Sequence, residues 1–311
     1  MRILVTGGAG FIGSHLAEYL SSYGNEIIVY DNFSSGKLSN LSKNRNIKII
    51  KGDIRNIDVL FRVSKDCEKI YHLAEFIPET KKSGEGHIIK FSVEKPLSDL
   101  KVNVGGTINV LEVARRRDCK VIFTSSAAVY GNYKQKIKEN YEPKPISPYG
   151  VFKYTCELLL SMYSKLYGIE FAIARIFNSY GPRQRKYLFY DALLKLKKNP
   201  NKLVLLGNGE QKRDFIYVKD TVKALFLIDK KVKNDVVNVG NGNGIKILDA
   251  IKVLLKIKGI NPKIRFTGTS WLGDIKILVS DNTKLKSLGY KPSFNLQRGM
   301  IELIKWFEKT H

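Results

Sequence analysis

Tyr149 and Lys153 stand four residues apart in the segment YGVFK, a spacing that suits acid–base chemistry. On a helix, residues i and i+4 lie on one face, one turn apart. A lysine ammonium beside a phenol favours the phenolate, so the pair predicts a lowered pKa for Tyr149 and a general base near neutral pH. The same spacing is common by chance on surface helices, so the pair needs support from neighbouring segments.

A hydroxyl-rich segment, TSSAAVYG at residues 124–131, supplies that support. It follows an apolar run typical of a buried strand, and α/β proteins bind ligands at the carboxyl ends of such strands. A hydroxyl there is placed to hydrogen-bond a reacting oxygen. The pair itself falls in SPYGVFK, and SPYG at residues 147–150 is typical of a helix start.

A glycine-rich turn near the N-terminus, TGGAGFIG, predicts a dinucleotide site because a strand precedes it and a helix follows it. Gly7 would allow the tight turn, Gly10 the close approach of a pyrophosphate, and Gly13 the packing of helix on strand. The helix N-terminus would offer amide groups and a positive dipole to the phosphates. The turn is therefore interpreted as the site of a dinucleotide cofactor.

Asp31 ends the second expected strand, 18 residues after Gly13. A carboxylate at this place can accept both hydroxyls of the adenosine ribose and would repel a 2′-phosphate, so it favours NAD over NADP. Asp53 follows the third expected strand and would reach the adenine amino group. Taken alone, its GD dipeptide is as typical of a simple turn.

Alternating strands and helices must position these residues in the first half of the chain. Apolar strands are expected at 2–6, 26–31, 47–50, 70–74, 121–125 and 171–177, with helices at 96–117 and 147–167. Continuous apolar strands separated by helices indicate a parallel sheet covered on both faces. The right-handed crossover rule then predicts an α/β, doubly wound sheet of the Rossmann type.

The second half of the chain has a looser pattern. Helices are expected at 187–198, at 247–258 and at the C-terminus, with strands at 203–206, 236–240 and 264–266. We expect an NAD-binding Rossmann domain over residues 1–177, to which residues 214–242 return. Residues 178–311 would form mainly a smaller C-terminal α/β lobe that binds the substrate.

The composition excludes several other classes of protein. The 311 residues include 53 Lys and Arg against 29 Asp and Glu, a formal net charge of +24. The basic residues are spread along the chain without an aromatic nucleic-acid motif, so no nucleic-acid partner is expected. No apolar run reaches the ~20 residues of a membrane helix, and the N-terminus runs directly into a strand. Three isolated cysteines and four histidines without ligand spacing predict no metal and a cytoplasmic location.

These motifs together resemble one family along nearly the whole chain. The chain is similar to the extended short-chain dehydrogenase/reductases, in the NAD-dependent epimerase/dehydratase family, and nearest to the UDP-glucose 4-epimerase group. The segments that carry the resemblance are TGGAGFIGSHL, DN, GDI, HLA, VNVGGTINVLE, TSSAAVYG, SPYGVFK, ARIFNSYGPRQ and RDFIYVKD.

The resemblance implies a role for individual residues. Ser126 would be the catalytic serine beside Tyr149, and Lys153 would also hold the nicotinamide ribose. Asn178 would contact the sugar-nucleotide diphosphate and Arg213 would pair with a phosphate. The residues implied in NAD binding, besides the glycines, Asp31 and Asp53, are Phe11, Ile12, Asn32, Ile54, Leu73, Ala74 and Asn103.

The implied reaction is a 4-epimerisation of a nucleotide sugar, most naturally a UDP-sugar, through a transient 4-keto sugar with tightly bound NAD. Related dehydratases resemble one another in an acid pair after the active-site hydroxyl, and related decarboxylases carry a glutamate there. Here these positions are Ala127 and Ala128. Two alternatives stay open: an NAD-dependent dehydrogenase or reductase of a sugar nucleotide or small alcohol, and an NAD-sensing protein without activity.

The chain departs from the family pattern in two places. The segment between HLA and the next helix, residues 75–95, is longer than usual, and Gly84 and Gly86 suggest a hairpin there, either a lid or a surface excursion. Trp271 stands where the family commonly has an arginine that binds the diphosphate. The family resemblance also implies a homodimer through the helices at 96–117 and 147–167. The apolar stripe expected to serve both core and partner is Phe152, Cys156, Leu159, Leu160 and Tyr163.

Overall fold

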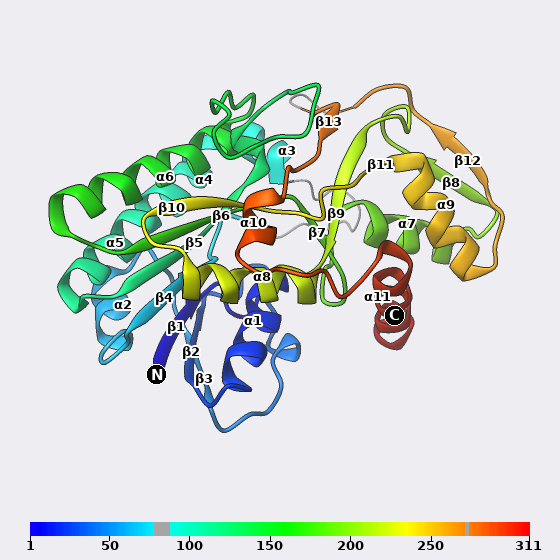
Figure 1. Cartoon of the computed structure of the whole chain (residues 1–311). Helices are drawn as coiled ribbons and strands as arrows, with labels where there is room; N and C mark the ends of the chain where they lie inside the picture. Colours follow the sequence, from blue (N-terminus) through cyan, green and yellow to red (C-terminus); the bar gives the residue numbers. More distant parts are fainter. Residues whose placement is uncertain (78–87, 271–273) are drawn as a thin grey trace.

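A computed structural model describes residues 1–77, 88–270 and 274–311 of the chain, arranged around a seven-stranded parallel sheet (Figure 1). In spatial order its strands are β3 (Ile47–Lys51), β2 (Glu26–Asp31), β1 (Arg2–Thr6), β4 (Lys69–His72), β5 (Lys120–Ser126), β6 (Phe171–Ile176) and β10 (Asp235–Val239). The strand order reverses between β1 and β4, which makes the sheet doubly wound. Such a reversal point opens a crevice at the carboxyl ends of the strands.

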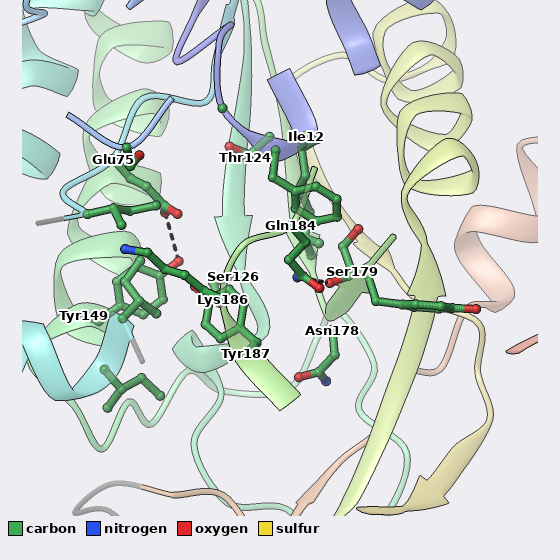
Figure 2. Close-up of a pocket in the computed structure, with 18 of the residues that line it drawn as sticks. Ile12, Glu75, Thr124, Ser126, Tyr149, Asn178, Ser179, Gln184, Lys186 and Tyr187 are labelled. Carbon is green, nitrogen blue, oxygen red and sulfur yellow. Dashed lines mark hydrogen bonds between the residues drawn. The ribbon is translucent and has the colours of Figure 1, made fainter. Parts of the chain in front are cut away.

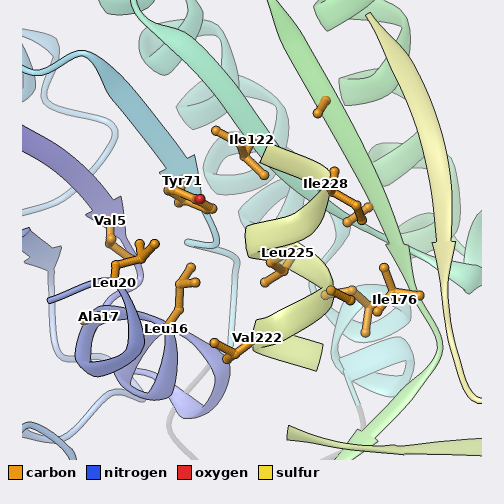
Figure 3. Close-up of a cluster of buried hydrophobic side chains, with 14 of the residues drawn as sticks. Val5, Leu16, Ala17, Leu20, Tyr71, Ile122, Ile176, Val222, Leu225 and Ile228 are labelled. Carbon is orange, nitrogen blue, oxygen red and sulfur yellow. The ribbon is translucent and has the colours of Figure 1, made fainter. Parts of the chain in front are cut away.

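Helices cover both faces of this sheet. One face packs against α1 (Phe11–Ser21) and α8 (Val218–Lys231). The other packs against α2 (Ile57–Val63), α5 (Gly106–Arg117) and α6 (Pro148–Tyr167). Figure 3 shows the first interface, where Leu16 and Leu20 of α1 and Leu225 of α8 meet the strand residues Val5 and Ile122. Because both faces are covered, alternate residues of the central strands β1, β4, β5 and β6 are buried on opposite sides, as the continuous apolar strands predict, whereas most of the edge strand β3 is exposed.

The chain after β6 forms two small sheets apart from the large one. A small sheet contains β11 (Gly244–Lys246), β9 (Lys212–Tyr217) and β13 (Ile277–Leu278), and β7 (Asn178–Tyr180) pairs with β9. β8 (Lys202–Leu205) pairs with β12 (Lys263–Phe266). The helices α7 (Tyr187–Lys198), α9 (Ile247–Lys258) and α11 (Leu296–Thr310) share one apolar core with these strands. This is the predicted smaller C-terminal α/β lobe.

The expected helix at 96–117 is interrupted. It consists of α4 (Pro96–Leu100), a π-helical turn η2 (Lys101–Gly105) and α5. The apolar periodicity runs across this turn, so the sequence pattern alone does not reveal it. A further helix, α3 (Ile88–Glu94), lies in the long segment after β4, whereas Gly84 and Gly86 fall outside the described residues.

β10 forms the edge of the large sheet beside β6, and β9 belongs to the small sheet. The chain therefore crosses between the two sheets within residues 214–242. The division into domains at residue 177 stays a prediction. No helix among the described residues has both the length and the apolar character that a bilayer crossing needs.

Four of the five residues of the predicted stripe on α6 face inward, and the fifth, Phe152, is half-buried and lies outside that core. Cys156, Leu160 and Tyr163 are buried in the core between α6 and the sheet, with Leu159 packed against it. The apolar side chains that α6 leaves exposed are different ones: Val151, Leu158, Met162 and Leu166. The inward stripe therefore supports the fold, and the exposed face is separate from it.

Candidate active site

A cleft of about 800 Å³ runs from the glycine turn across the carboxyl ends of the strands to the second lobe. Figure 2 shows Tyr149 and Ser126 in this cleft together with Asn178, and Tyr187 lies beside Tyr149, against whose apolar cluster it packs. Most of the predicted site residues line this cleft: Gly7, Gly10, Phe11, Ile12, Gly13, Asp31, Asn32, Ile54, Leu73, Ala74, Ser126, Tyr149, Lys153, Asn178 and Arg213. The fold thus brings the nucleotide turn and the acid–base pair into one space.

The glycine turn leaves no room for side chains. Gly7 has φ +68°, and a Cβ added to it would lie 2.7 Å from the backbone nitrogen of Ala74. A Cβ on Gly13 would lie 2.2 Å from the carbonyl oxygen of Gly7. The first glycine is therefore required by backbone conformation and the other by the packing of α1 on the turn. The resulting cradle at the start of α1 fits the pyrophosphate of a dinucleotide.

Asp31 is buried at the end of β2, beside this cradle. Its carboxylate accepts hydrogen bonds from the amides of Ala9 at 2.9 Å and Phe33 at 2.8 Å. Burial raises the pKa of Asp31, and the two amide hydrogen bonds oppose that rise. The two bonds use only part of the acceptor capacity of a carboxylate, so the group can also accept from ribose hydroxyls.

Replacement of Asp31 by Ala is expected to relax the preference for NAD over NADP, because the charge that repels a 2′-phosphate is lost. Titration of the purified protein with each cofactor measures the ratio of the two dissociation constants. Asp31→Asn is the matched variant, because it removes the charge, keeps the side-chain size and retains one acceptor oxygen for one of the two amides, Ala9 or Phe33. A wild-type protein that prefers NADP would contradict this role of Asp31.

Two predicted cofactor residues, Asp53 and Asn103, do not line the cleft. The Asp53 carboxylate pairs with Arg55 at 2.8 Å, and this contact holds the pKa of Asp53 below its usual range. The Asn103 side chain accepts from the amide of Phe76 at 2.8 Å and donates to Asp99. Both side chains therefore have partners within the protein. Asn103 orders the segment after β4, so its effect on the cleft is indirect.

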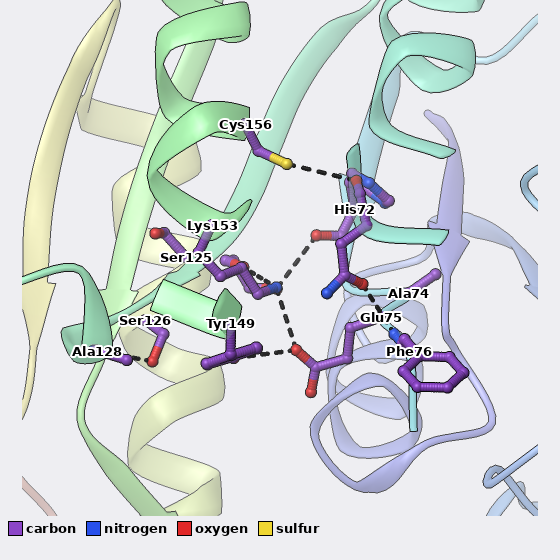
Figure 4. A network of polar contacts seen from close by, with 12 residues as sticks. His72, Ala74, Glu75, Phe76, Ser125, Ser126, Ala128, Tyr149, Lys153 and Cys156 are labelled. Atoms are coloured by element: carbon purple, nitrogen blue, oxygen red, sulfur yellow. Dashed lines mark hydrogen bonds and ion pairs between the residues drawn. The ribbon is translucent and has the colours of Figure 1, made fainter. Parts of the chain in front are cut away.

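Tyr149 and Lys153 lie one turn apart near the start of α6, as the spacing predicts (Figure 4). Ser147 caps this helix, and its side chain accepts from the amide of Gly150 at 3.2 Å. The Lys153 ammonium donates to the carbonyl oxygen of Thr124 at 3.0 Å. It also forms an ion pair with Glu75 at 3.1 Å, and the Tyr149 hydroxyl donates to the same Glu75 oxygen at 3.2 Å.

The predicted direction of the Tyr149 pKa is wrong for this arrangement. The pKa of Tyr149 is raised well above its ordinary value, first by burial and then by the carboxylate of Glu75 and by Tyr187. Only the hydrogen bond with Ser126 lowers it. The prediction rested on nearby positive charge, chiefly that of Lys153, and it missed a carboxylate that contacts both the phenol and the ammonium.

The strand that carries Ser126 is held by a buried network. The Ser125 hydroxyl donates to Glu157 at 2.5 Å, and Glu157 forms an ion pair with Arg175 at 2.6 Å. The Ser126 oxygen accepts from the amide of Ala128 at 3.2 Å and caps the short turn η3 (Ala127–Val129). Ser125 and Ser126 both line the cleft, but the Ser125 hydroxyl is engaged by Glu157, whereas that of Ser126 is not.

The predicted substrate residues lie at the far side of the cleft. Arg213 is buried, and its guanidinium pairs with Asp274 at 2.6 Å. Asn178 presents a buried side-chain nitrogen that has no hydrogen-bond partner among the described residues. An amide placed in this way fits a polar ligand. Trp271 lies outside the described residues.

Comparison with known proteins places the chain in a family. The model of the NAD dependent epimerase/dehydratase family matches residues 3–240. The chain belongs to this family. It is 36% identical over 326 residues to a putative UDP-glucose 4-epimerase of Methanocaldococcus jannaschii, and the match covers 99% of each protein.

Solved structures of family members are similar over the whole chain. The UDP-glucose 4-epimerase of Thermotoga maritima, solved with UDP-glucose, is 34% identical with a TM-score of 0.90, covering 100% of this chain and 99% of that one. The UDP-glucuronic acid 4-epimerase of Bacillus cereus, solved with UDP-glucuronic acid and NAD, is 31% identical with a TM-score of 0.90 and full coverage of both chains. The protein is an NAD-dependent enzyme of the epimerase class, and its glycine cradle and Asp31 fit that cofactor.

The motifs of the family do not identify every residue in the cleft. Lys186 and Tyr187, just before α7 and at its start, follow the last residue of the ARIFNSYGPRQ motif and line the cleft as well (Figure 2). Glu75, directly after the HLA motif, contacts both Tyr149 and Lys153. The sequence carries one signal for Glu75, its place just past the carboxyl end of a central strand, where α/β proteins hold their ligands.

Proposed function

We propose that this protein is a UDP-sugar 4-epimerase, with UDP-glucose and UDP-galactose as its substrate pair. The observation that carries the proposal is the presence of Ser126, Tyr149 and Lys153 in the same cleft as the glycine cradle. A base beside the nicotinamide site is what the oxidation of a sugar hydroxyl requires. The UDP-glucose and UDP-glucuronic acid bound to the two solved relatives support a uridine diphosphate sugar as substrate.

In this proposal Tyr149 takes the proton from the sugar 4-hydroxyl as the C4 hydride leaves. NAD, which the glycine cradle, Asp31 and Lys153 would hold, would supply the acceptor for that hydride and its later return. Ser126 donates a hydrogen bond to the developing 4-keto oxygen, and Lys153 orients the ribose of the cofactor. The keto sugar turns over in the cleft, receives the hydride on its other face, and regains its proton from Tyr149. Atoms and electrons balance, with no net change in the cofactor.

The residues after Ser126 favour epimerisation over two related reactions. Ala127 and Ala128 are buried and apolar, so neither gives a proton to the C5 or C6 position of the sugar. A dehydratase or decarboxylase needs an acid at this place. The dehydrogenase alternative differs in the fate of the cofactor, because a dehydrogenase accumulates NADH.

A panel of UDP-, GDP- and dTDP-sugars tests the substrate class. Each sugar nucleotide is incubated with the purified protein, the epimers are resolved by chromatography, and nicotinamide absorbance is followed. We expect interconversion of UDP-glucose and UDP-galactose without added NAD and without net NADH. If no nucleoside diphosphate binds at millimolar concentration in calorimetry, the nucleotide-sugar assignment fails and a small-alcohol dehydrogenase replaces it.

The homodimer is part of the same proposal. The exposed apolar side chains of α6 gather on one side of that helix, with Leu158 53% and Leu166 64% exposed. Leu100 of α4 and Ile108 of α5, the neighbouring helices, are exposed as well. An apolar helical face of this kind is suited to bury itself against a second copy of the chain.

Light scattering at micromolar concentration is therefore expected to give twice the mass of the chain. The double variant Leu158→Glu, Met162→Glu places charges on the exposed face of α6 and is expected to give a monomer. Leu38→Glu, at an exposed leucine outside α5 and α6, is the matched control and should remain a dimer. A wild-type monomer would contradict the proposed interface.

A further inference from the structure

Glu75 holds a place in the catalytic centre that none of the family motifs assigns. It follows β4 directly, and one carboxylate oxygen accepts from the Tyr149 hydroxyl at 3.2 Å and lies 3.1 Å from the Lys153 ammonium (Figure 4). The Lys153 side chain is 3% exposed and that of Glu75 is 23% exposed. The carboxylate thus bridges base and ammonium from a position that is only partly shielded from solvent.

The charges around this bridge come from several elements. Facing Tyr149 are Ser126 of β5, Lys153 of α6, and Tyr187 of α7. Lys186, just before α7, and Asp99 of α4 lie within electrostatic reach of Glu75, and His72 of β4 within reach of Lys153. The side chains that α3 contributes beside Tyr149, Ile88 and Ile89, are apolar. Among the described residues, Glu75 is the carboxylate that contacts the phenol.

This contact has a consequence for the base. A phenol that donates to a carboxylate is held in its protonated form, because the phenolate would face a like charge at hydrogen-bond distance. The same carboxylate satisfies part of the hydrogen-bonding capacity of the buried Lys153 ammonium. Glu75 therefore acts on the position of both side chains and on the charge state of one of them.

We propose that Glu75 is a positioning residue of the catalytic centre, whose carboxylate holds Tyr149 and Lys153 together and sets the pH range in which Tyr149 acts as the base. The proposal deepens the proposed function and rests on it for the role of Tyr149 as base. The raised pKa of Tyr149, caused in part by Glu75, agrees with the geometry.

The test is the pH profile of turnover in wild type and Glu75→Gln. The limb in which activity rises with pH is expected to move to lower pH by about one to two units in the variant, because a charge at this distance changes a pKa by that order. Glu75→Asp keeps the charge and is expected to return the limb toward the wild-type position. Glu94→Gln, which removes one carboxylate from the nearby helix α3, is the matched control and should leave the limb in place.

A spectroscopic titration separates this proposal from the proposed function. The phenolate absorbance of Tyr149 is obtained as the difference between a protein and the same protein carrying Tyr149→Phe, with and without Glu75→Gln. The midpoint should fall in the Glu75→Gln background whether or not a sugar nucleotide is turned over. An unchanged midpoint and an unchanged limb in a variant that unfolds at the wild-type temperature would overturn the role of Glu75. If Glu75→Gln does not fold, Glu75→Ala provides the same comparison with the same two outcomes.

Discussion

Tyr149→Phe is expected to lower turnover by at least ~100-fold, the usual scale for the loss of a general base. The variant keeps the ring that packs in the cleft and removes only the hydroxyl that would take the sugar proton. The effect should fall on kcat, with little change in KM, because the lost interaction belongs to the transition state. Initial rates with a competent sugar nucleotide measure it.

Bound NAD should remain at the wild-type level in this variant, since the glycine cradle and Asp31 are untouched. Tyr154→Phe is the matched control, because Tyr154 lies on the same helix and does not line the cleft. It should retain wild-type turnover. Near-normal turnover in Tyr149→Phe would refute the assignment of Tyr149 as the base.

Arg213→Ala is expected to raise the KM for a nucleotide sugar by about tenfold or more. A charged hydrogen bond to a phosphate contributes about 1.5–3 kcal/mol, which corresponds to one to two decades of affinity. Arg213 and Arg183 both line the cleft, and Arg183 is engaged with Glu18 at 2.8 Å. Arg185, Lys186 and Lys195 also line the cleft, so the expected increase is set at about tenfold, the lower end of that range.

The same change leaves the buried carboxylate of Asp274 without its partner, and breaking such a pair costs about 3–5 kcal/mol of stability. The double variant Arg213→Ala, Asp274→Asn removes the stranded charge. It should regain most of the unfolding temperature while the KM stays high. If the double variant regains affinity together with stability, Arg213 supports the fold and does not bind the diphosphate.

The parts of the site that could be predicted from the sequence are those that depend on residues close together in the chain. The glycine turn is specified locally, since Gly7 adopts a left-handed backbone conformation and Gly13 packs against Gly7 itself. The Tyr149–Lys153 pair depends only on helical spacing, and Asp31 on its place at the end of a strand. These features can be predicted without knowing how distant segments pack together. The structure places all of these residues in the cleft.

The parts that could not be predicted depend on contacts between distant segments. Tyr149 and Glu75 are 74 residues apart, and Arg213 and Asp274 are 61 apart. No spacing rule links such residues, because their distance is set by the packing of whole elements. The pKa of Tyr149 was predicted in the wrong direction for this reason. Asp53 is a different case, because Arg55, the residue that occupies its carboxylate, is only two positions away in the sequence.

The most direct measurement for the central claim follows a deuterium label at C4 of the sugar nucleotide. A 4-epimerase removes that hydride and returns it to the same carbon within one bound complex. UDP-glucose labelled at C4 should therefore become UDP-galactose with the label retained at C4, with no added NAD and no net NADH. Transfer of the label to a released cofactor, or a keto sugar that accumulates as NADH rises, would contradict the account and identify a dehydrogenase.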